Sequence, residues 1–452
     1  MSTRFVPFLA MLVIVVGGCG TARNVAWPEP RPLAEEFPTY KPPIDPEASN
    51  STTDDVAGDT LALNEALRLA LQQNPELREA GWEVRAREAA TLQAGLWPNP
   101  EIGADIEEFG GTGPLAALSA AEIGGGIGQL LPFGGDVGAR RDVAARERDL
   151  AGWTYEAARL DVATYTMQTF VDVLAAQRRL ALADSLLQIA DRFLETVASR
   201  AEAGKVSPLE VERAGIVRSN VVIERREAVA DLEAARKQLG AAWGETTPTF
   251  ERVVGSLAEV GPIPAYESVR SLVERNPDVA RWSTEITLRR ADLSLARANR
   301  IPDPIFTAGP SRFQETGETA FRAGISIPLP IFDRNQGAIQ ESKYRIRQAE
   351  SGASSARVEA ESRLASAYET LAAALDRIDI LRTSVLPAAR RSFEGIEEGY
   401  REGKFDLLSV LDAQRTLFES TNNYVEALAT YHQARAEVER LIGTPLSEIL
   451  IE

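Results

Sequence analysis

The sequence is poor in the residues that build compact chemical sites. Among its 452 residues it has one cysteine, Cys19, and one histidine, His432. A single cysteine cannot form an internal disulfide, and one cysteine with one histidine cannot complete the four-ligand shell of a structural zinc site. A catalytic triad would have to use His432, which lies in a helical pattern and which we interpret as a surface or packing residue. We therefore expect no enzymatic activity and no cofactor.

Basic charge is also scarce. Lys and Arg number 49 against 66 Asp and Glu, which gives a formal net charge of −17. Nucleic-acid binding depends on a basic surface that contacts phosphates, so this balance argues against it. An acidic surface is compatible with cationic cargo, but solubility alone explains it equally well. No stretch after residue 20 holds the ~18 apolar residues that a membrane-spanning helix needs.

The N-terminus has the form of a targeting signal. The apolar run 5–16 has the length of a signal-peptide core and is too short to span a membrane. Small residues then lead to Cys19, and this arrangement resembles a bacterial lipoprotein signal, in which residues 1–18 are removed and the cysteine is lipidated. Gly20 after the cysteine implies sorting to the outer membrane; the alternative is a chance cysteine in an ordinary signal peptide. The proline-rich segment 19–58 is then a tether along the folded body.

The rest of the chain contains two copies of one unit. Short motifs recur in the same order about 200 residues apart, which is not expected by chance. The paired landmarks are Asn74-Pro75 with Asn276-Pro277, Pro98-x-Pro100 with Pro302-x-Pro304, Leu131-Pro132 with Leu329-Pro330, and Gly204-Lys205 with Gly403-Lys404. We divide the chain into repeats at 59–261 and 262–452, each with the order helix, strand, strand, long helix, turn, helix.

Apolar residues in the long segments follow the period of coiled coils. Leu364, Leu371 and Ile378 mark a heptad seam in the second repeat, and the predicted helix 139–202 carries apolar residues on more than one side. A helix with several apolar sides has several neighbours, so the pattern favours a bundle or cylinder over an isolated two-stranded coil. The predicted fold class is mainly α with a small β part.

The Pro-x-Pro motifs interrupt the helical pattern and precede alternating segments. In 101–109 and 320–331 apolar residues alternate with polar ones, which is typical of a barrel wall between lipid and water; the alternative is an amphipathic hairpin packed on the helices. Four strands per chain cannot enclose a lumen, and membranes do not tolerate open sheet edges, so spanning strands would require several chains, with twelve strands from three copies. The candidate lumen-facing residues are Glu101, Asp105, Glu107 and Arg322.

These features resemble the TolC family of outer-membrane efflux proteins over nearly the whole chain after Cys19. The segment Gly403–Ala413 is similar to the family's Gly-x-x-x-hydrophobic-x-Val-Leu-Asp-Ala signature. Long gapless helices and two Pro-x-Pro interruptions look most like the CzcC/CusC-type branch, which serves heavy-metal efflux. The resemblance implies a homotrimer whose strands form one 12-stranded β-barrel in the outer membrane lipid and whose helices form a tunnel across the periplasm.

The resemblance also implies a function. The chain would be the outer-membrane channel of a tripartite RND-type efflux system, a passive exit duct joined through a periplasmic adaptor (membrane fusion) protein to an inner-membrane RND pump. Heavy-metal cations are the expected cargo, and multidrug efflux or protein secretion is the alternative within the family. A non-pore periplasmic coiled-coil structural lipoprotein is the alternative of another class.

The family likeness assigns positions to two groups of residues. The turns at Gly204 and Gly403 would form the periplasmic tip, where Asp412 occupies a position linked to an acidic constriction. The alternatives for Asp412 are a solvated helix-end carboxylate or an ion pair with Arg415. The candidate aperture residues are Asp412, Ser409, Glu210 and Asp406. The junctions where helices become strands would be Pro98, Pro100, Pro302 and Pro304.

Overall fold

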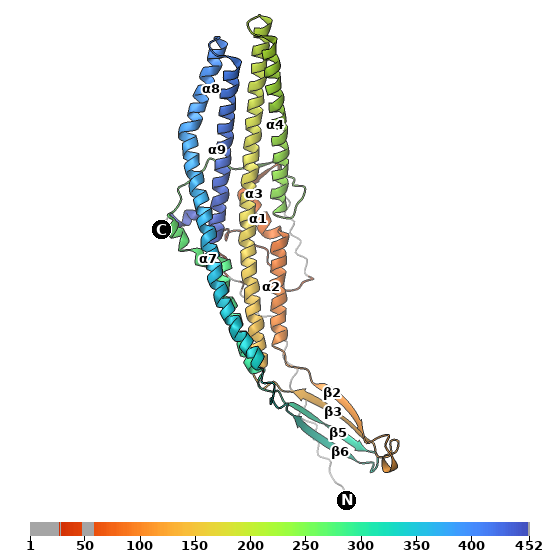
Figure 1. Cartoon of the computed structure of the whole chain (residues 1–452). Coiled ribbons are helices and arrows are strands. Elements are labelled where there is room, and N and C mark those ends of the chain that lie inside the picture. The colour runs from red at the N-terminus through yellow and green to blue at the C-terminus, as the bar shows by residue number, and fades with distance from the viewer. Residues whose placement is uncertain (1–26, 28, 48–57, 451–452) are drawn as a thin grey trace.

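The computed structural model describes residues 27, 29–47 and 58–450 (Figure 1). Two long helical hairpins lie side by side with their turns at one end of the molecule, and a four-stranded sheet extends from the other end. The signal segment 1–18 and the predicted lipidation site Cys19 lie outside the described residues.

The same order of strands and long helices occurs twice. The first set comprises β1 (Thr60–Ala62), α1 (Leu63–Gln73), α2 (Pro75–Ala94), β2 (Glu101–Glu107), η1 (Gly113–Leu115), β3 (Glu122–Leu130), α3 (Asp136–Glu202), α4 (Pro208–Ala241) and β4 (Arg252–Val254). The second comprises α5 (Tyr266–Arg270), η2 (Val273–Arg275), α6 (Pro277–Ala298), β5 (Ile305–Phe313), β6 (Thr319–Ser326), α7 (Gln336–Ile380), the π-helical turn η3 (Leu381–Val385), α8 (Leu386–Arg401), α9 (Leu407–Ile442) and α10 (Leu446–Ile449). This is the mainly α architecture with a small β part that the sequence predicts.

The two Asn-Pro motifs start helices and tie each set of elements together. Asn74 caps α2, since its side chain accepts a hydrogen bond from the Leu77 N–H at 2.9 Å. The following proline, Pro75, favours the same helix start because its ring fixes the first helical φ. Its side-chain amide donates to the Ala242 carbonyl, also at 2.9 Å, just after α4. Asn276 repeats the arrangement in the second set, donating to the Leu441 carbonyl of α9 at 2.9 Å. Each helix start is thus bonded to the end of its own returning helix.

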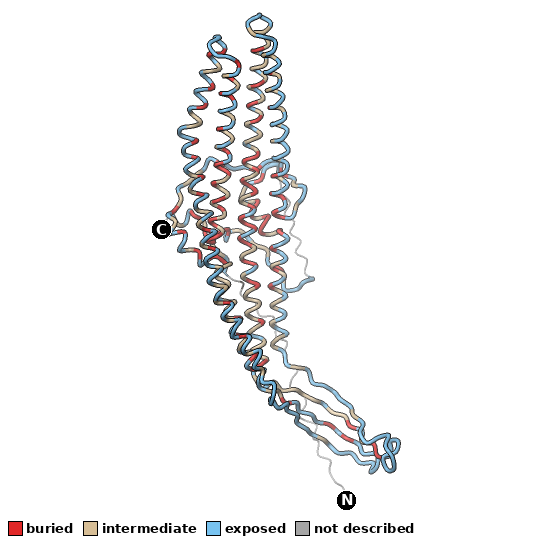
Figure 2. Tube along the Cα trace, in the orientation of Figure 1, coloured by how far each residue is buried: buried red, intermediate tan, exposed pale blue. Residues whose placement is uncertain are grey.

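The long helices pack along seams with a seven-residue period, as expected for coiled coils. In the second set, Leu364, Leu371 and Ile378 on α7 are buried, which confirms the predicted seam. The buried seam of α3 consists of Tyr155, Val162, Thr169, Ala176, Ala183, Ala190 and Val197. Figure 2 shows that burial is greatest along the facing sides of the helices and that most of the sheet is exposed.

The four-stranded sheet has the antiparallel order β2-β3-β5-β6, so the two sets of elements meet between β3 and β5. A second, parallel pair joins β1 to β4 beside the helices. Strand β6 ends at Ser326, earlier than the predicted end near Ile331. Pro328 and Pro330 explain the difference, because a proline has no N–H to donate to a strand ladder.

Candidate functional site

The Pro-x-Pro motifs lie between helix and strand in both sets of elements. Pro98 and Pro100 separate α2 from β2, and Pro302 and Pro304 separate α6 from β5. The two junctions are also bonded to the sheet. The Leu131 N–H donates to the Pro304 carbonyl at 3.0 Å, and the Gln129 side chain donates to the Pro98 carbonyl at 3.1 Å. The prolines therefore occupy the links between the helices, which end at Ala94 and Ala298, and the strands of the sheet.

One face of the sheet is polar, and the structure brings two of its predicted residues into contact. Arg322 of β6 lies 2.7 Å from a carboxylate oxygen of Asp105 on β2, although β3 and β5 lie between them. The guanidinium also lies 3.4 Å from Glu122 of β3. Glu101 and Glu107 alternate onto the same face of β2 and, with Asp105 and Arg322, line a recess of about 580 Å³.

Glycine makes this long reach of Arg322 across the sheet possible. A Cβ atom at Gly124 would lie 1.9 Å from the guanidinium and 2.6 Å from the Asp105 carboxylate, so a side chain there would displace both. Glu122 also accepts a hydrogen bond from the Ser311 hydroxyl of β5. Sequence reasoning missed Glu122 and Ser311. Glu122 begins β3 and Ser311 lies near the end of β5, and these two strand ends pair with each other.

The opposite face of the sheet is apolar and uncovered in the single chain. Ile102 is 88% exposed and Phe321 is 75% exposed, and both alternate with the polar residues of their strands. Among the described residues no strand pairs with the outer edge of β2 or of β6. Such open edges and bare apolar surface are unfavourable in water, so this part of the chain is incomplete without further cover.

The helical hairpins turn at the end of the molecule opposite the sheet (Figure 1). Gly204 and Gly403 adopt left-handed backbone conformations in these two turns, with φ of 69° and 80°. Asp406 caps α9, because its carboxylate accepts hydrogen bonds from the Ser409 N–H at 2.9 Å and from the Ser409 hydroxyl at 2.5 Å. These bonds lower the pKa of Asp406. Asp406 and Ser409 thus have a local structural role.

The other two aperture candidates also lie near the starts of the returning helices, Glu210 in the first turn of α4 and Asp412 one turn further into α9. Asp412 on α9 is paired with Arg415 at 3.0 Å, and both side chains are exposed. The single chain therefore contains the ion pair that was the alternative interpretation of Asp412. Glu210 lies in the first turn of α4. Burial of the Tyr400 phenol raises the pKa of Tyr400, and the negative charge of Glu210 adds to this rise.

Tyr400 belongs to a contact between the two hairpins that sequence reasoning missed. The Arg200 guanidinium at the end of α3 lies 4.5 Å from the Tyr400 ring centroid and donates to the Tyr400 carbonyl at 2.5 Å. Phe193 packs against the same ring with a centroid distance of 5.4 Å. No local signal reveals this pairing, because the partners are about 200 residues apart and meet only after both hairpins have formed.

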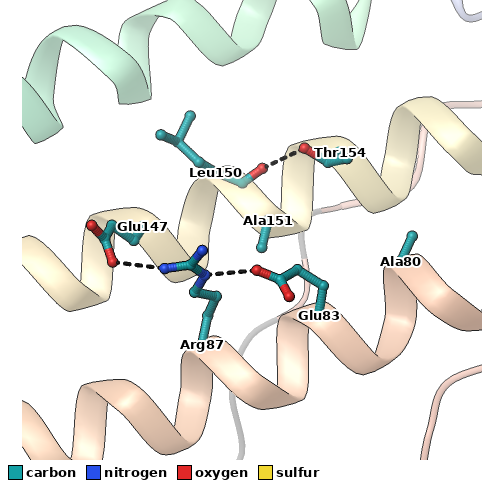
Figure 3. A pocket seen from close by; sticks show the side chains of 7 residues that line it. All are labelled: Ala80, Glu83, Arg87, Glu147, Leu150, Ala151 and Thr154. Carbon is teal, nitrogen blue, oxygen red and sulfur yellow. Dashed lines mark hydrogen bonds and ion pairs between the residues drawn. The ribbon is translucent and has the colours of Figure 1, made fainter.

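A recess between α2 and α3 shows how the helical body differs from a ligand site (Figure 3). Arg87 lies between two carboxylates, 2.7 Å from Glu83 and 3.1 Å from Glu147. The hydrogen bond and charge of Glu83, followed by those of Glu147, raise the pKa of Arg87. The rest of the lining is uncharged, with Ala80 on α2 and Leu150, Ala151 and Thr154 on α3. The charged groups of this recess are therefore paired with one another, and the pair of Arg87 with Glu147 connects the two helices.

None of the helices in the described part of the chain is both long and apolar enough to cross a membrane.

Comparison with known proteins identifies the chain's relatives. The outer membrane efflux protein family matches residues 66–245 and 269–444, one segment in each predicted repeat. The cobalt-zinc-cadmium resistance protein CzcC of Cupriavidus metallidurans is 33% identical over 86% of this chain and 91% of its own length. The nickel-cobalt-cadmium resistance protein NccC of Alcaligenes xylosoxydans xylosoxydans is 26% identical over 68% of this chain and 69% of its own.

A solved structure has the same fold. A crystal structure of CusC aligns with a TM-score of 0.73 at 17% identity, covering 90% of this chain and 99% of that chain. The family match and the relative CzcC confirm the predicted TolC-type resemblance and outer-membrane efflux function, and the solved structure confirms the mainly α fold. The chain is a member of the outer membrane efflux protein family.

Proposed function

We propose that three copies of this chain form an exit duct for heavy-metal cations across the outer membrane. The observation that supports the assembly most directly is the open sheet. Its apolar face is bare and its two edges are unpaired among the described residues, so neighbouring copies are needed to close it. Three sheets of order β2-β3-β5-β6 would give a barrel of twelve strands. The duct would be passive, with an inner-membrane RND pump as the source of energy and a periplasmic adaptor as the connection.

The cargo proposal depends on the relatives and on charge. CzcC and NccC are named for resistance to cobalt, zinc, cadmium and nickel. The net charge of −17 and the polar sheet face, where Glu101, Asp105 and Glu107 exceed the single Arg322, suit cations. Pyoverdine export proteins are also among the relatives, at 23% identity. Export of organic molecules is therefore the second candidate.

A cross-linking experiment tests the shared barrel. Within one chain β2 and β6 are separated by β3 and β5, so they lie about 14 Å apart at the usual strand spacing, too far for a disulfide. We expect Ala104→Cys on β2, combined with Ala323→Cys or Ile325→Cys on β6, to form disulfides between chains and to give dimers and trimers on non-reducing gels. The single variant Ala104→Cys is the control. Monomers in every pairing would contradict the barrel.

A growth experiment tests the cargo. We would delete the gene and measure inhibition by cobalt, zinc, cadmium, nickel and copper beside a panel of hydrophobic drugs, with the wild-type gene restored as the control. Metal sensitivity that the wild type reverses supports the proposal, and drug sensitivity alone would replace metals by organic cargo. Conductance in planar bilayers separates both from the non-pore structural lipoprotein, which would give no channels.

We also propose that Asp412 of three copies contributes to an acidic aperture at the periplasmic tip, with Glu210, Asp406 and Ser409 around it. Its support is position, because Asp412 lies near the turn and its carboxylate is exposed. Replacement by Asn should raise the closed-state conductance. Glu419→Gln is the matched control, since Glu419 also lies beside Arg415, at 3.8 Å. Equal conductance of Asp412→Asn and wild type would overturn this role.

The lipid anchor at Cys19 is a separate proposal supported by the signal-like segment before it. Mass spectrometry of the mature protein should find diacylglycerol and an amide-linked acyl chain on Cys19. The variant Cys19→Ser is the control and should lack both groups. An unmodified Cys19, or cleavage at another residue, would contradict the proposal.

A further inference from the structure

The described part of the N-terminal segment, Trp27 and residues 29–47, lies against the helices although it forms neither helix nor strand; we refer to it as the strap. Trp27 packs edge-on against Tyr155 of α3 with a centroid distance of 4.8 Å. The Tyr155 hydroxyl donates to the Tyr40 carbonyl at 2.6 Å, so the phenol contacts the strap at two points. Burial beneath the strap raises the pKa of Tyr155. The strap is therefore bound at defined positions on α3.

Next to Tyr155 on α3 is a buried ion pair. Glu156 and Arg159 are 2.8 Å apart, and each side chain is only 2% exposed. Removing two charges from water is unfavourable unless their remaining hydrogen-bonding capacity is satisfied. An ordinary i,i+3 ion pair lies exposed on a helix surface and avoids this cost. The groups that cover Glu156 and Arg159 must therefore supply the missing hydrogen bonds.

The main chain of the strap covers and completes the pair. The Arg31 N–H donates to Glu156 at 2.6 Å. The Arg159 guanidinium donates to the Leu33 carbonyl at 2.9 Å and to the Arg31 carbonyl at 2.8 Å. On the strap side all three bonds use main-chain atoms. The ion pair therefore recognises the backbone of the strap and not its side chains.

The same two strap residues also contact the second set of elements. The Leu33 N–H donates to the carbonyl of Gly443 at 3.0 Å, and Gly443 ends α9 in the left-handed conformation with φ of 69°. A Cβ atom at Gly443 would lie 3.3 Å from the Arg31 side chain, which shows how closely the strap approaches the end of α9. One short stretch of strap thus connects α3 of the first set to the end of α9 of the second.

Further along, the strap binds α1 and α2. The Tyr40 N–H donates to the Leu71 carbonyl at 2.9 Å. Arg85 of α2 donates to the Pro42 carbonyl at 3.0 and 3.1 Å. A Cβ atom at Gly81 would lie 2.9 Å from the Pro42 ring, so glycine leaves the space that the strap occupies.

We propose that Glu156 and Arg159 form a main-chain docking site for the strap, and that the docked strap staples the end of α9 to α3. The strap is then part of the folded body, in addition to any role as the tether of a lipid anchor. Its loss would loosen the C-terminal end of α9 selectively. The equivalent end of α4, at Ala242 to Glu245, has a similar left-handed glycine, Gly244, to which no hydrogen bond from the strap is made.

Hydrogen–deuterium exchange of the purified full-length protein tests this proposal. In Arg159→Met we expect the amides of Arg31 and Leu33 to exchange at least tenfold faster than in the wild type. The amides of Thr444 and Leu446, just after α9, should exchange at least threefold faster, while Ala242 to Glu245 should change less than twofold. Arg146→Met is the matched control, because Arg146 is an arginine of α3 whose ion pairs, with Asp142 and Asp149, do not involve the strap.

Each contrary result has a definite meaning. Unchanged exchange at Arg31 and Leu33 would overturn the docking site. Faster exchange there without a change at Thr444 and Leu446 would overturn the staple, and an equal rise at Ala242 to Glu245 would show general loosening and overturn it too.

A second pair of variants leaves α3 intact, in case Arg159→Met fails to fold. Arg31→Pro deletes the N–H that Glu156 accepts, whereas Arg31→Ala keeps this N–H and deletes only the side chain. A main-chain docking site predicts that exchange at Leu33 is at least threefold faster in Arg31→Pro than in Arg31→Ala. Equal exchange in the two variants would overturn the proposal.

Discussion

The long helix that follows the strands is continuous in the first repeat and interrupted in the second. The buried seam of α3 keeps strict steps of seven from Tyr155 to Val197. In the second repeat the steps are regular as far as Ile378, but Phe393, the next buried aromatic, comes one residue later than two further heptads would place it. The extra residue falls where the π-helical turn Leu381–Val385 lies.

The π-helical turn absorbs the extra residue, because such a turn is wider by one residue than an α-helical turn. Pro387 follows it and has no N–H for the carbonyl of Thr383, four residues earlier, so an undisturbed α-helix would be strained there. In Figure 1 the α7–α8 helix bends more than α3 does. One hairpin therefore bends while the same side of its helix stays buried on both sides of the π-helical turn.

The largest expected effect comes from deleting one residue in each repeat. Deleting the exposed Gln188 rotates the rest of α3 by about 100° and moves Ala190 and Val197 out of the seam. We expect Tm to fall by about 10 °C or more. Deleting Thr383 together with Pro387→Ala removes the extra residue and should change Tm by less than about 3 °C. Thermal denaturation of both proteins checks this, and equal losses would contradict the interpretation of the π-helical turn.

The second prediction concerns the place where the two repeats meet in the sheet. A Cβ atom at Gly309 of β5 would lie 1.9 Å from the Gly125 carbonyl oxygen of β3, whereas one at Gly103 of β2 has nothing within 4 Å. We expect Gly309→Ala to reduce folded protein in the outer-membrane fraction by more than half, because two main chains would have to separate. Gly103→Ala is the control and should match the wild type. Normal levels of Gly309→Ala would show that the sheet adjusts.

The third prediction separates packing from hydrogen bonding where the hairpins touch. Tyr400 is only 2% exposed, so Tyr400→Ala should cost about 3–5 kcal/mol in the free energy of unfolding. The Tyr400 hydroxyl is buried and has no hydrogen-bond partner among the described residues. Tyr400→Phe should therefore be neutral within about 1 kcal/mol. Urea denaturation measures both, and a large loss in Tyr400→Phe would reveal a partner for the hydroxyl.

The fourth prediction tests a partly buried carboxylate between the repeats. Desolvation raises the pKa of Asp172 on α3, although Gln433 of α9 donates to it at 2.6 Å. A raised folded-state pKa means that the favourable contribution is present at low pH and is lost as pH rises through that pKa. Asp172→Asn should therefore raise Tm at pH 7 by about 2 °C. The difference should shrink toward pH 4, and a constant difference would contradict its electrostatic origin.

The smallest effect is expected at His432, where the pKa is lowered and not raised as it is for Asp172. Burial lowers the pKa of His432, whose ring nitrogen lies 2.9 Å from the Leu257 carbonyl. Its contribution to stability is present above the ordinary histidine pKa and is lost as pH falls through the lowered one. His432→Gln, which keeps a donor for Leu257, should lose about 1–2 °C less in Tm than the wild type between pH 7 and pH 5. Identical pH profiles would remove His432 as a source of acid sensitivity.

Periodic features were predictable from the sequence, and contacts between distant segments were not. The seam through Leu364 and Ile378 follows from spacing, and the faces of Asp105 and Arg322 follow from alternation. Their contact across two strands also needs Gly124, which spacing alone does not reveal.

The tip and the strap show the same limit. Arg200 meets Tyr400 only through the packing of two hairpins. Glu156 and Arg159 have the spacing of an ordinary surface pair, and only the docked strap shows that they are buried. A charge pattern on one helix contains no information on a segment more than 100 residues away that covers it.

The two asparagine caps also separate bonds within a repeat from contacts between repeats. Asn74 joins the start of α2 to the end of α4, and Asn276 joins the start of α6 to the end of α9, with the same donor and the same distance of 2.9 Å. Neither bond crosses from one repeat to the other. A single repeat would thus make this bond with its own residues, whereas the pairing of β3 with β5 and the packing of α3 against α6 and α9 join the two copies. The extra residue before Pro387 distinguishes the second copy from the first, whose seam keeps strict steps of seven.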